Sequence, residues 1–284
     1  MNKPGYISLN GVLSESSEAL VSPENRAMLY GDGCFETLKN YQGRFLAWEA
    51  HIERLQGGLN YLEMDAPVNS NKLKEEVLDL LDANGLRDEE AMVRIQFWRK
   101  GGRGYKSDIR EASRMVQVHP YTPKPQPMEL IAAKTRCIPS ESLERKYKLT
   151  NGLNYIKAAQ EANKHHKDDA LMLTLHGYVS ETTIANVFWI NGDVFYTPSE
   201  ECDLLPGITR NIMMDLIKDL GYKIEVGQFN PESFYKADAA FGTNSLIEIR
   251  EILSVDGRTF KTGHKLITDL QKAFQTYKEN VLTK

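Results

Sequence analysis

Residues 177–198 read GYVSETTIANVFWINGDVFYTP, and the short runs within them indicate the fold class. Three runs, 177–180, 185–190 and 194–197, have the length and the β-branched or aromatic content of strands. Asn191 and Gly192 separate the last two runs and predict a two-residue hairpin turn, because both residue types tolerate positive φ. Hairpin-linked strands favour an α+β fold over a doubly wound parallel sheet.

Helices and strands mix on both sides of this stretch. Apolar residues at spacings of three and four predict helices over 48–62, 72–83, 155–163, 206–220 and 264–282. Runs rich in β-branched and aromatic residues predict strands over 33–39, 91–98, 113–118, 129–135, 170–175, 239–243 and 246–255. The mixture in both halves supports the α+β interpretation.

Four prolines crowd the segment HPYTPKPQP, residues 119–127. Proline blocks both helix and central strand, so this segment predicts an interdomain linker. A chain of 284 residues is also longer than one typical domain. We therefore expect an N-terminal α+β domain over 1–119, a linker over 120–128 and a C-terminal α+β domain over 129–284.

Composition and charge exclude several functions. A net charge of −4 argues against a nucleic acid or an anionic membrane as the partner. The longest apolar runs, such as 170–175, are too short to span a bilayer, and MNKPGYISLNG lacks a signal region, so we expect a cytoplasmic protein. The three cysteines are widely spaced and no metal-ligand motif is present, so neither a disulfide framework nor a metal site is expected.

No general catalytic motif is present: the chain lacks GxSxG, a P-loop and a strand-linked GxGxxG. Five segments nevertheless stand out together: YGDGCFETLKNYQGRFLAWEAHIERL (30–55), KYKLTNGLNYIKAAQEA (146–162), GYVSETTIANVFWINGDVFYTP (177–198), LPGITR (205–210) and FGTNSLIEI (241–249). In this order they resemble the class IV aminotransferase family, which depends on pyridoxal 5′-phosphate (PLP). That family includes branched-chain aminotransferases, D-amino-acid aminotransferases and 4-amino-4-deoxychorismate lyases. The resemblance implies a two-domain fold-type IV PLP enzyme with the cofactor in the cleft between its α+β domains.

The resemblance assigns Lys148 as the Schiff-base lysine. Such a lysine holds the cofactor and then moves the proton on the substrate carbon. Lys146 and Lys157 are the alternatives, but Lys148 has the family's spacing to Glu181, and Asn151 completes its K-x-x-N form. Which tyrosine meets the cofactor's hydroxyl stays open, because the pair Asn154-Tyr155 is displaced from its place in branched-chain enzymes.

The resemblance also supplies the remaining cofactor residues. Glu181 matches the carboxylate that keeps the pyridine nitrogen protonated. Arg54 matches the arginine that binds the phosphate, although its helical position alone would indicate a solvated side chain. Backbone N–H groups and side chains that would complete the phosphate site belong to Ile208, Thr209, Thr243 and Asn244.

Candidate substrate residues lie in the first half of the chain. Phe35, Thr37 and Lys39 alternate along one predicted strand and therefore face the same way. The resemblance implies that Lys39 and Arg103 receive a substrate carboxylate. Further candidates are Arg94, chosen by strand alternation, Tyr105 in the glycine-rich loop, and Arg26 before YGDG.

Two reactions fit the resemblance. The family is mostly made of transaminases, which favours amino-group transfer between an amino acid, branched-chain or D-, and a 2-oxo acid. GGRGY at 101–105 instead resembles the lyases, which release pyruvate and 4-aminobenzoate, whereas Lys39 and Asn151-Gly152 depart from the lyase pattern. A third hypothesis, an inactive PLP-fold binding protein, predicts a missing lysine or glutamate, and both are present.

The family implies a homodimer acting on small molecules.

Overall fold

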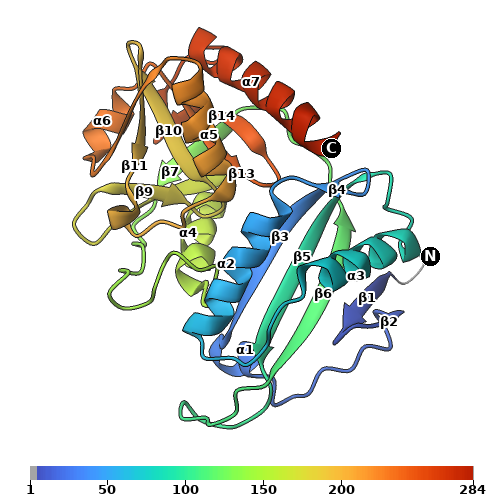
Figure 1. The fold of residues 1–284 in the computed structure, drawn as a ribbon. Coiled ribbons are helices and arrows are strands. Elements are labelled where there is room, and N and C mark those ends of the chain that lie inside the picture. Colours follow the sequence, from blue (N-terminus) through green and yellow to red (C-terminus); the bar gives the residue numbers. More distant parts are fainter. Residues whose placement is uncertain (1–4, 284) are drawn as a thin grey trace. The chain divides into compact units, whose positions relative to one another are not determined.

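A computed structural model describes residues 5–283 and divides them into two compact units (Figure 1). The first unit comprises residues 5–122 and 147–151, and the second comprises 123–146 and 152–283. The main division, between Thr122 and Pro123, falls inside the proline-rich segment. The short segment 147–151 packs with the first unit, whereas the sequence analysis assigned Lys148 to the C-terminal domain; the reason is its backbone pairing with a strand of the first unit.

The first unit is built on one antiparallel sheet of six strands in the order β2-β1-β6-β5-β3-β4. Two helices pack on one face, because Glu36 of β3 bonds to α2 while Ser8 of β1 bonds to Glu76 of α3. Glu36, Ile95, Val116 and Ser8 form one cross-strand row, so their side chains share this face. The strands are β1 (Tyr6–Leu9), β2 (Val12–Glu15), β3 (Gly33–Tyr41), β4 (Arg44–Phe45), β5 (Glu90–Arg99) and β6 (Ala112–Pro120). The helices are α1 (Arg26–Tyr30), α2 (Trp48–Tyr61) and α3 (Ser70–Ala83).

The second unit contains a ring of six strands, β10-β13-β14-β7-β8-β9, which closes where β9 pairs with β10. Its strands are β7 (Met128–Ala132), β8 (Asp169–Leu173), β9 (Val179–Thr182), β10 (Asn186–Asn191), β11 (Val194–Pro198), β12 (Lys223–Gly227), β13 (Ala239–Asn244), β14 (Glu248–Val255) and β15 (Arg258–Thr259). Its helices are α4 (Leu153–Lys164), the short 3-10 turn Glu200–Cys202, α5 (Ile208–Asp219), α6 (Pro231–Tyr235) and α7 (Lys265–Leu282). Both faces of β8 and β10 are buried, which explains why these strands are continuous apolar runs rather than alternating ones.

Most predicted elements are present, with two instructive differences. The hairpin turn lies one residue later than predicted, because Asn191 pairs with Val194 and the loop is Gly192-Asp193. Gly192 has φ +59° while Asn191 has no positive φ, so only the first loop position requires a left-handed backbone. The strands β1, β2, β4, β12 and β15 were not predicted; β12 joins the sheet in parallel with β11 after the crossover through α5.

None of the helices in residues 5–283 has the length and apolar character needed to cross a membrane. Within the same residues, no group of three or more His, Cys, Asp or Glu side chains is placed to hold a metal ion.

Candidate functional site

The segment 147–151 is fixed against the start of β3 by its backbone. Phe35 N donates to the carbonyl of Lys148 at 2.9 Å, and Thr150 N donates to that of Gly33 at 2.9 Å. The Thr150 hydroxyl adds bonds to the carbonyls of Gly31, at 2.5 Å, and Gly33, at 3.0 Å. Lys148 is thereby anchored on both sides through the backbone.

Two of the predicted residues, Lys148 and Arg94, lie against the ring of a third, Phe35, on the sheet face opposite α2 and α3. Lys148 Nζ lies 5.0 Å from the ring centroid and the Arg94 guanidinium lies 3.8 Å from it. Thr37 is directly opposite Arg94 in the β3–β5 register, so it shares this face. Burial lowers the pKa of Arg94, as expected for a cation held away from water. The structure thus places an amine and a guanidinium against one aromatic ring.

Lys39 occupies the same strand, but its charge is already compensated. It is 5% exposed, and Nζ lies 3.0 Å from a carboxylate oxygen of Glu90. The rings of Tyr41 and Tyr121 lie 5.0 and 5.2 Å from the same ammonium. The role of Lys39 as a receiver of a substrate carboxylate stays a prediction, in which the substrate would compete with Glu90.

The glycine-rich loop carries Arg103 and Tyr105, and both side chains are exposed, Tyr105 by 92%. Arg26, only 3% exposed, supports this loop. Its guanidinium donates to the carbonyls of Gly102, at 3.0 Å, and Gly104, at 2.8 Å, and pairs with Asp32 at 2.7 Å. Arg26 is therefore engaged in holding the loop.

In the second unit, Glu181 is buried at the end of β9 and accepts three described hydrogen bonds. The Tyr155 hydroxyl donates to Oε1 at 2.6 Å, while Asn186 Nδ2 and Leu205 N each donate to Oε2 at 3.2 Å. Arg145 donates to the hydroxyl oxygen of Tyr155 and so places a cation one step from the carboxylate. Burial, and then the charge of Glu181, raises the pKa of Tyr155 well above its ordinary value, so this tyrosine stays a neutral donor.

Two of the groups predicted to bind phosphate in this unit, Thr243 and the start of α5, lie beside Asn186. Asn186 is opposite Glu181 on β9 and opposite Thr243 on β13, so the three side chains share one face. A Cβ added to Gly207 would meet Asn186 Oδ1, which shows how closely the start of α5 approaches this row. A larger residue at 207 would therefore require the Asn186 side chain to move.

The start of α5 has the properties of a phosphate site. No side chain caps the helix at its N-cap residue, Gly207. The first turn of the helix is nevertheless buried, since Thr209 is 4% exposed. The Thr243 hydroxyl is buried and has no hydrogen-bond partner within residues 5–283. Uncapped N–H groups and a hydroxyl with no partner are the donors that a phosphate would accept from, so Ile208, Thr209 and Thr243 fit a phosphate-bearing cofactor. Asn244 instead caps the β13–β14 turn, since its Oδ1 accepts from Leu246 N and Ile247 N at 2.8 Å each.

Arg54 lies in the first unit, on the face of α2 that packs on β3, and not in solvent as its helical position indicated. Its side chain is 13% exposed, and Nε and Nη2 donate to the two oxygens of Glu36 at 2.7 and 2.8 Å. His51 Nδ1 lies 2.7 Å from Glu36 Oε2. Neither Glu36 nor His51 was singled out from the sequence, because their pairing joins two separate elements.

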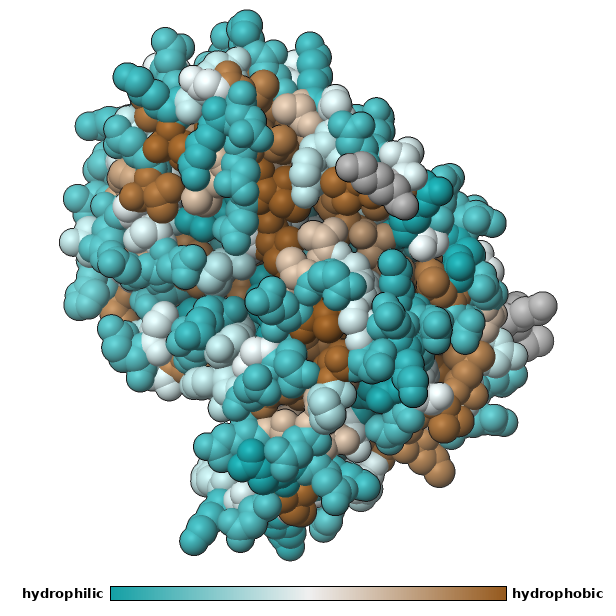
Figure 2. All heavy atoms as spheres, in the orientation of Figure 1, coloured by the Kyte–Doolittle hydropathy of each residue, from teal (hydrophilic) through white to brown (hydrophobic). Residues whose placement is uncertain are grey.

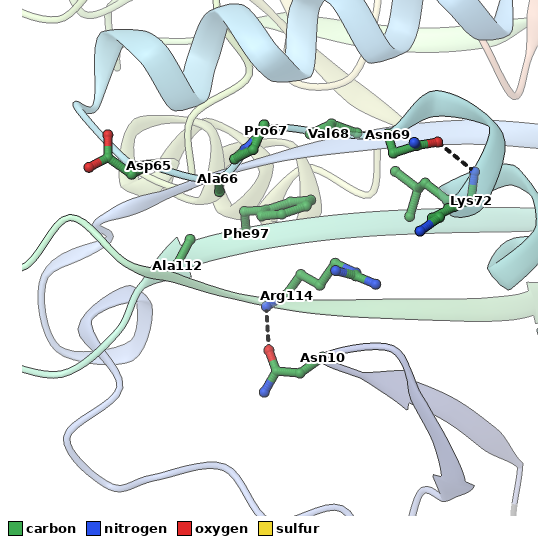
Figure 3. Close-up of a pocket in the computed structure, with 11 residues that line it drawn as sticks. Asn10, Asp65, Ala66, Pro67, Val68, Asn69, Lys72, Phe97, Ala112 and Arg114 are labelled. Carbon is green, nitrogen blue, oxygen red and sulfur yellow. Dashed lines mark hydrogen bonds between the residues drawn. The ribbon is translucent and has the colours of Figure 1, made fainter.

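A separate cavity of about 310 Å³ opens on the helix-covered side of the same sheet (Figure 3). Phe97 and Arg114 line it and pair with each other in the β5–β6 register, opposite Cys34 on β3. Cys34 and Phe35 alternate along β3, so the cavity and the Phe35–Arg94–Lys148 group lie on opposite faces. The cavity is therefore not a part of the candidate site.

Comparisons with known proteins agree with these observations. A family model described as amino-transferase class IV matches residues 33–255. An aminodeoxychorismate lyase of Bacillus subtilis is 31% identical over 249 residues, which cover 86% of this chain and 84% of that protein. A branched-chain-amino-acid aminotransferase of Pseudomonas aeruginosa is 28% identical over 287 residues, which cover 96% of this chain and 92% of that protein. The crystal structure of a T.th. branched-chain amino acid aminotransferase with pyridoxamine 5′-phosphate matches with a TM-score of 0.87 at 25% identity, covering 96% of this chain and 94% of that one.

Proposed function

Because the chain belongs to the class IV aminotransferase family, we propose that it is a PLP-dependent enzyme that transfers an amino group between an amino acid and a 2-oxo acid. One observation carries this proposal: Lys148 and Arg94 both lie against the ring of Phe35. An amino acid presents its amine one carbon away from its carboxylate. A reactive amine beside a buried guanidinium suits that pair of groups.

The residues that the family resemblance assigned would hold the cofactor. Lys148 would bind it covalently, Glu181 would accept a hydrogen bond from its ring nitrogen, and Arg54 with the start of α5 and Thr243 would bind its phosphate. When bound, PLP supplies a ring that withdraws electrons from the substrate carbon. The Asn244 carboxamide caps a turn and donates to the carbonyl of Ile184 at 2.8 Å, so its part in the phosphate site stays a prediction.

The chain's own groups would perform the proton chemistry. Lys148 would take the proton from the substrate carbon and return it, as a general base and acid. Arg94 would orient the substrate through its carboxylate, and Phe35 would cover the group on one side. Glu181, held by Tyr155, Asn186 and Leu205 N, would keep the cofactor nitrogen protonated.

A second candidate function is the elimination reaction of an aminodeoxychorismate lyase. The similarity to the Bacillus subtilis lyase, 31% over 86% of this chain, favours it. Lys148 could serve both reactions, since each begins with removal of a proton from the same kind of carbon. The two reactions differ in whether the amino group stays with the protein-bound cofactor or leaves with an aromatic product.

A paired assay on one preparation of PLP-loaded protein tests the function. We expect D- or L-amino acids to convert the visible absorption of the bound cofactor to that of its amine form, with release of a 2-oxo acid. Aminodeoxychorismate in a parallel sample would give no 4-aminobenzoate. Formation of 4-aminobenzoate and pyruvate without conversion by any amino acid would replace the transaminase by the lyase.

We further propose that the protein is a homodimer in the cytoplasm. Large apolar side chains of the first unit are exposed in the single chain, with Leu20 at 89% and Met28 at 70%. Figure 2 shows hydrophobic residues (brown) at several places on the mainly hydrophilic face that it draws. Such side chains favour burial in an interface. Sedimentation velocity is expected to give one species of twice the chain mass; a monomer at micromolar concentration would refute the dimer.

A further inference from the structure

A buried cluster of three charged or titratable groups joins β3 to α2. Glu36 has a side chain only 1% exposed, and it accepts from Arg54 through both of its oxygens, at 2.7 and 2.8 Å. His51 Nδ1 lies 2.7 Å from Oε2, and the His51 side chain is 2% exposed. His51 and Arg54 are three residues apart on α2, so both reach the strand from the same side of the helix.

Glu36 is ionised in this cluster. Burial alone would raise its pKa, but the charge and hydrogen bonds of Arg54, followed by those of His51, lower the pKa from 4.5 to about 2. An ionised carboxylate and a guanidinium are expensive to remove from water, and apolar residues of similar size commonly stabilise a core as well or better. The cluster is therefore not explained by stability alone.

The geometry of the cluster fixes the direction of Arg54. The contact with Glu36 is bidentate and uses the Nε–Nη2 edge of a planar group. Two bonds to one carboxylate define the plane of the guanidinium, and they also define where its Nη1 edge points. Because His51 holds the second oxygen of Glu36, the carboxylate cannot rotate without breaking a bond.

We propose that Glu36, held by His51, is a positioning residue that aims Arg54 at the phosphate of the cofactor. The inference rests on the proposed function, in which Arg54 binds that phosphate. It extends the proposal to two residues that would not touch the cofactor, Glu36 and His51. It also explains why the ionised Glu36 carboxylate is buried between β3 and α2.

The test compares two cofactors on protein freed of PLP: PLP itself and pyridoxal, which lacks the phosphate. Equilibrium binding is followed by quenching of tryptophan fluorescence. For Glu36→Gln we expect the affinity for PLP to fall by about 10- to 100-fold, the range found when groups that orient metal ligands are removed. The affinity for pyridoxal should not change, because pyridoxal has no group for Arg54 to bind.

Three further variants make the result specific. Arg54→Ala should lower the preference for PLP over pyridoxal, which the start of α5 and Thr243 would still support in part, and adding Glu36→Gln to it should cause no further loss. Glu53→Gln, an exposed carboxylate next to Arg54 on α2, is the matched control and should bind both cofactors as the unaltered chain does. Glu36→Asp keeps the charge on a shorter side chain and is the substitute if Glu36→Gln does not fold; it should lose part of the preference.

The outcomes separate the two proposals. If Arg54→Ala lowers the preference for PLP while folded Glu36→Gln and Glu36→Asp retain it, the positioning role is wrong and the proposed function stands. Equal losses of affinity for PLP and for pyridoxal in the Glu36 variants would also overturn the positioning role. They would indicate that the Glu36–Arg54 pair only supports the structure. If the unaltered chain binds neither cofactor, the proposed function fails and this inference fails with it.

Discussion

Replacement of Lys148 by alanine is expected to lower kcat by at least ~10³-fold in whichever reaction the paired assay identifies. The amine would both hold the cofactor and move the substrate proton, and a positioned general base alone contributes roughly 10²- to 10⁴-fold. The fold should survive, because the segment is attached to β3 through the backbone of Lys148. The lost contact with the Phe35 ring is worth only about 0.5–1 kcal/mol.

Two neighbouring lysines are the controls for this prediction. Lys146 pairs with Glu144 at 3.2 Å and Lys157 lies 3.4 Å from Gln160, both on the surface. Alanine at either position should leave kcat within about twofold, as is usual for exposed positions. Borohydride reduction followed by peptide mass spectrometry identifies the lysine that carries the cofactor. If the reduced cofactor were found on Lys146 or Lys157, Lys148 would not be the residue that binds it.

Strand periodicity predicted correctly which side chains of β3 and β5 share a face. Alternation along 33–39 placed Phe35 and Thr37 on one face, and the same argument selected Arg94 on the neighbouring strand. The structure places Arg94 opposite Thr37 and over Phe35. This success has a simple cause: the direction of a side chain in a strand depends on the local backbone alone.

Pairing between distant elements could not be predicted in the same way. The helical pattern of 48–62 assigned Arg54 to solvent, because the position lies off the stripe formed by Ile52, Leu55 and Leu59. Its partner is a carboxylate on β3, eighteen residues earlier in the chain. Periodicity ranks positions by hydrophobicity, and it cannot identify a buried position that is filled by a charge with a partner elsewhere.

The sequence did contain a signal for one residue that was missed. Asn186 stands in the otherwise apolar run 185–190, and a polar side chain in a fully buried strand has to be satisfied by specific partners. The structure gives it Glu181 and the carbonyl of Leu205. Tyr155 and Arg145 offered no such signal, since nothing in their spacing indicates that both reach the neighbourhood of Glu181.

Glutamine in place of Glu181 is expected to lower kcat on the order of 10²- to 10³-fold and to change KM much less. The reason is the charge: two unit charges about 4 Å apart interact by roughly 4 kcal/mol at the effective dielectric of a protein, which sets the upper end of this range. Without the carboxylate, the cofactor nitrogen would lose its proton and the ring would withdraw electrons poorly. Steady-state kinetics on the identified reaction, with cofactor occupancy measured in parallel, tests the expectation.

The neighbours of Glu181 allow loss of charge to be separated from loss of structure. Glutamine keeps an oxygen for Asn186 and Leu205 N, but its amide replaces the oxygen that accepts from Tyr155, and such a loss costs about 1–3 kcal/mol of stability. Tyr155→Phe removes the same hydrogen bond, together with the one that the hydroxyl accepts from Arg145, and leaves the charge of Glu181 in place. It should therefore lose at least as much thermal stability with a much smaller fall in kcat. Glu225→Gln, on the exposed surface of β12, should change neither. If Tyr155→Phe lowers kcat as much as Glu181→Gln, the hydrogen-bond network and not the carboxylate charge controls the reaction, and Glu181 would lose the role assigned to it.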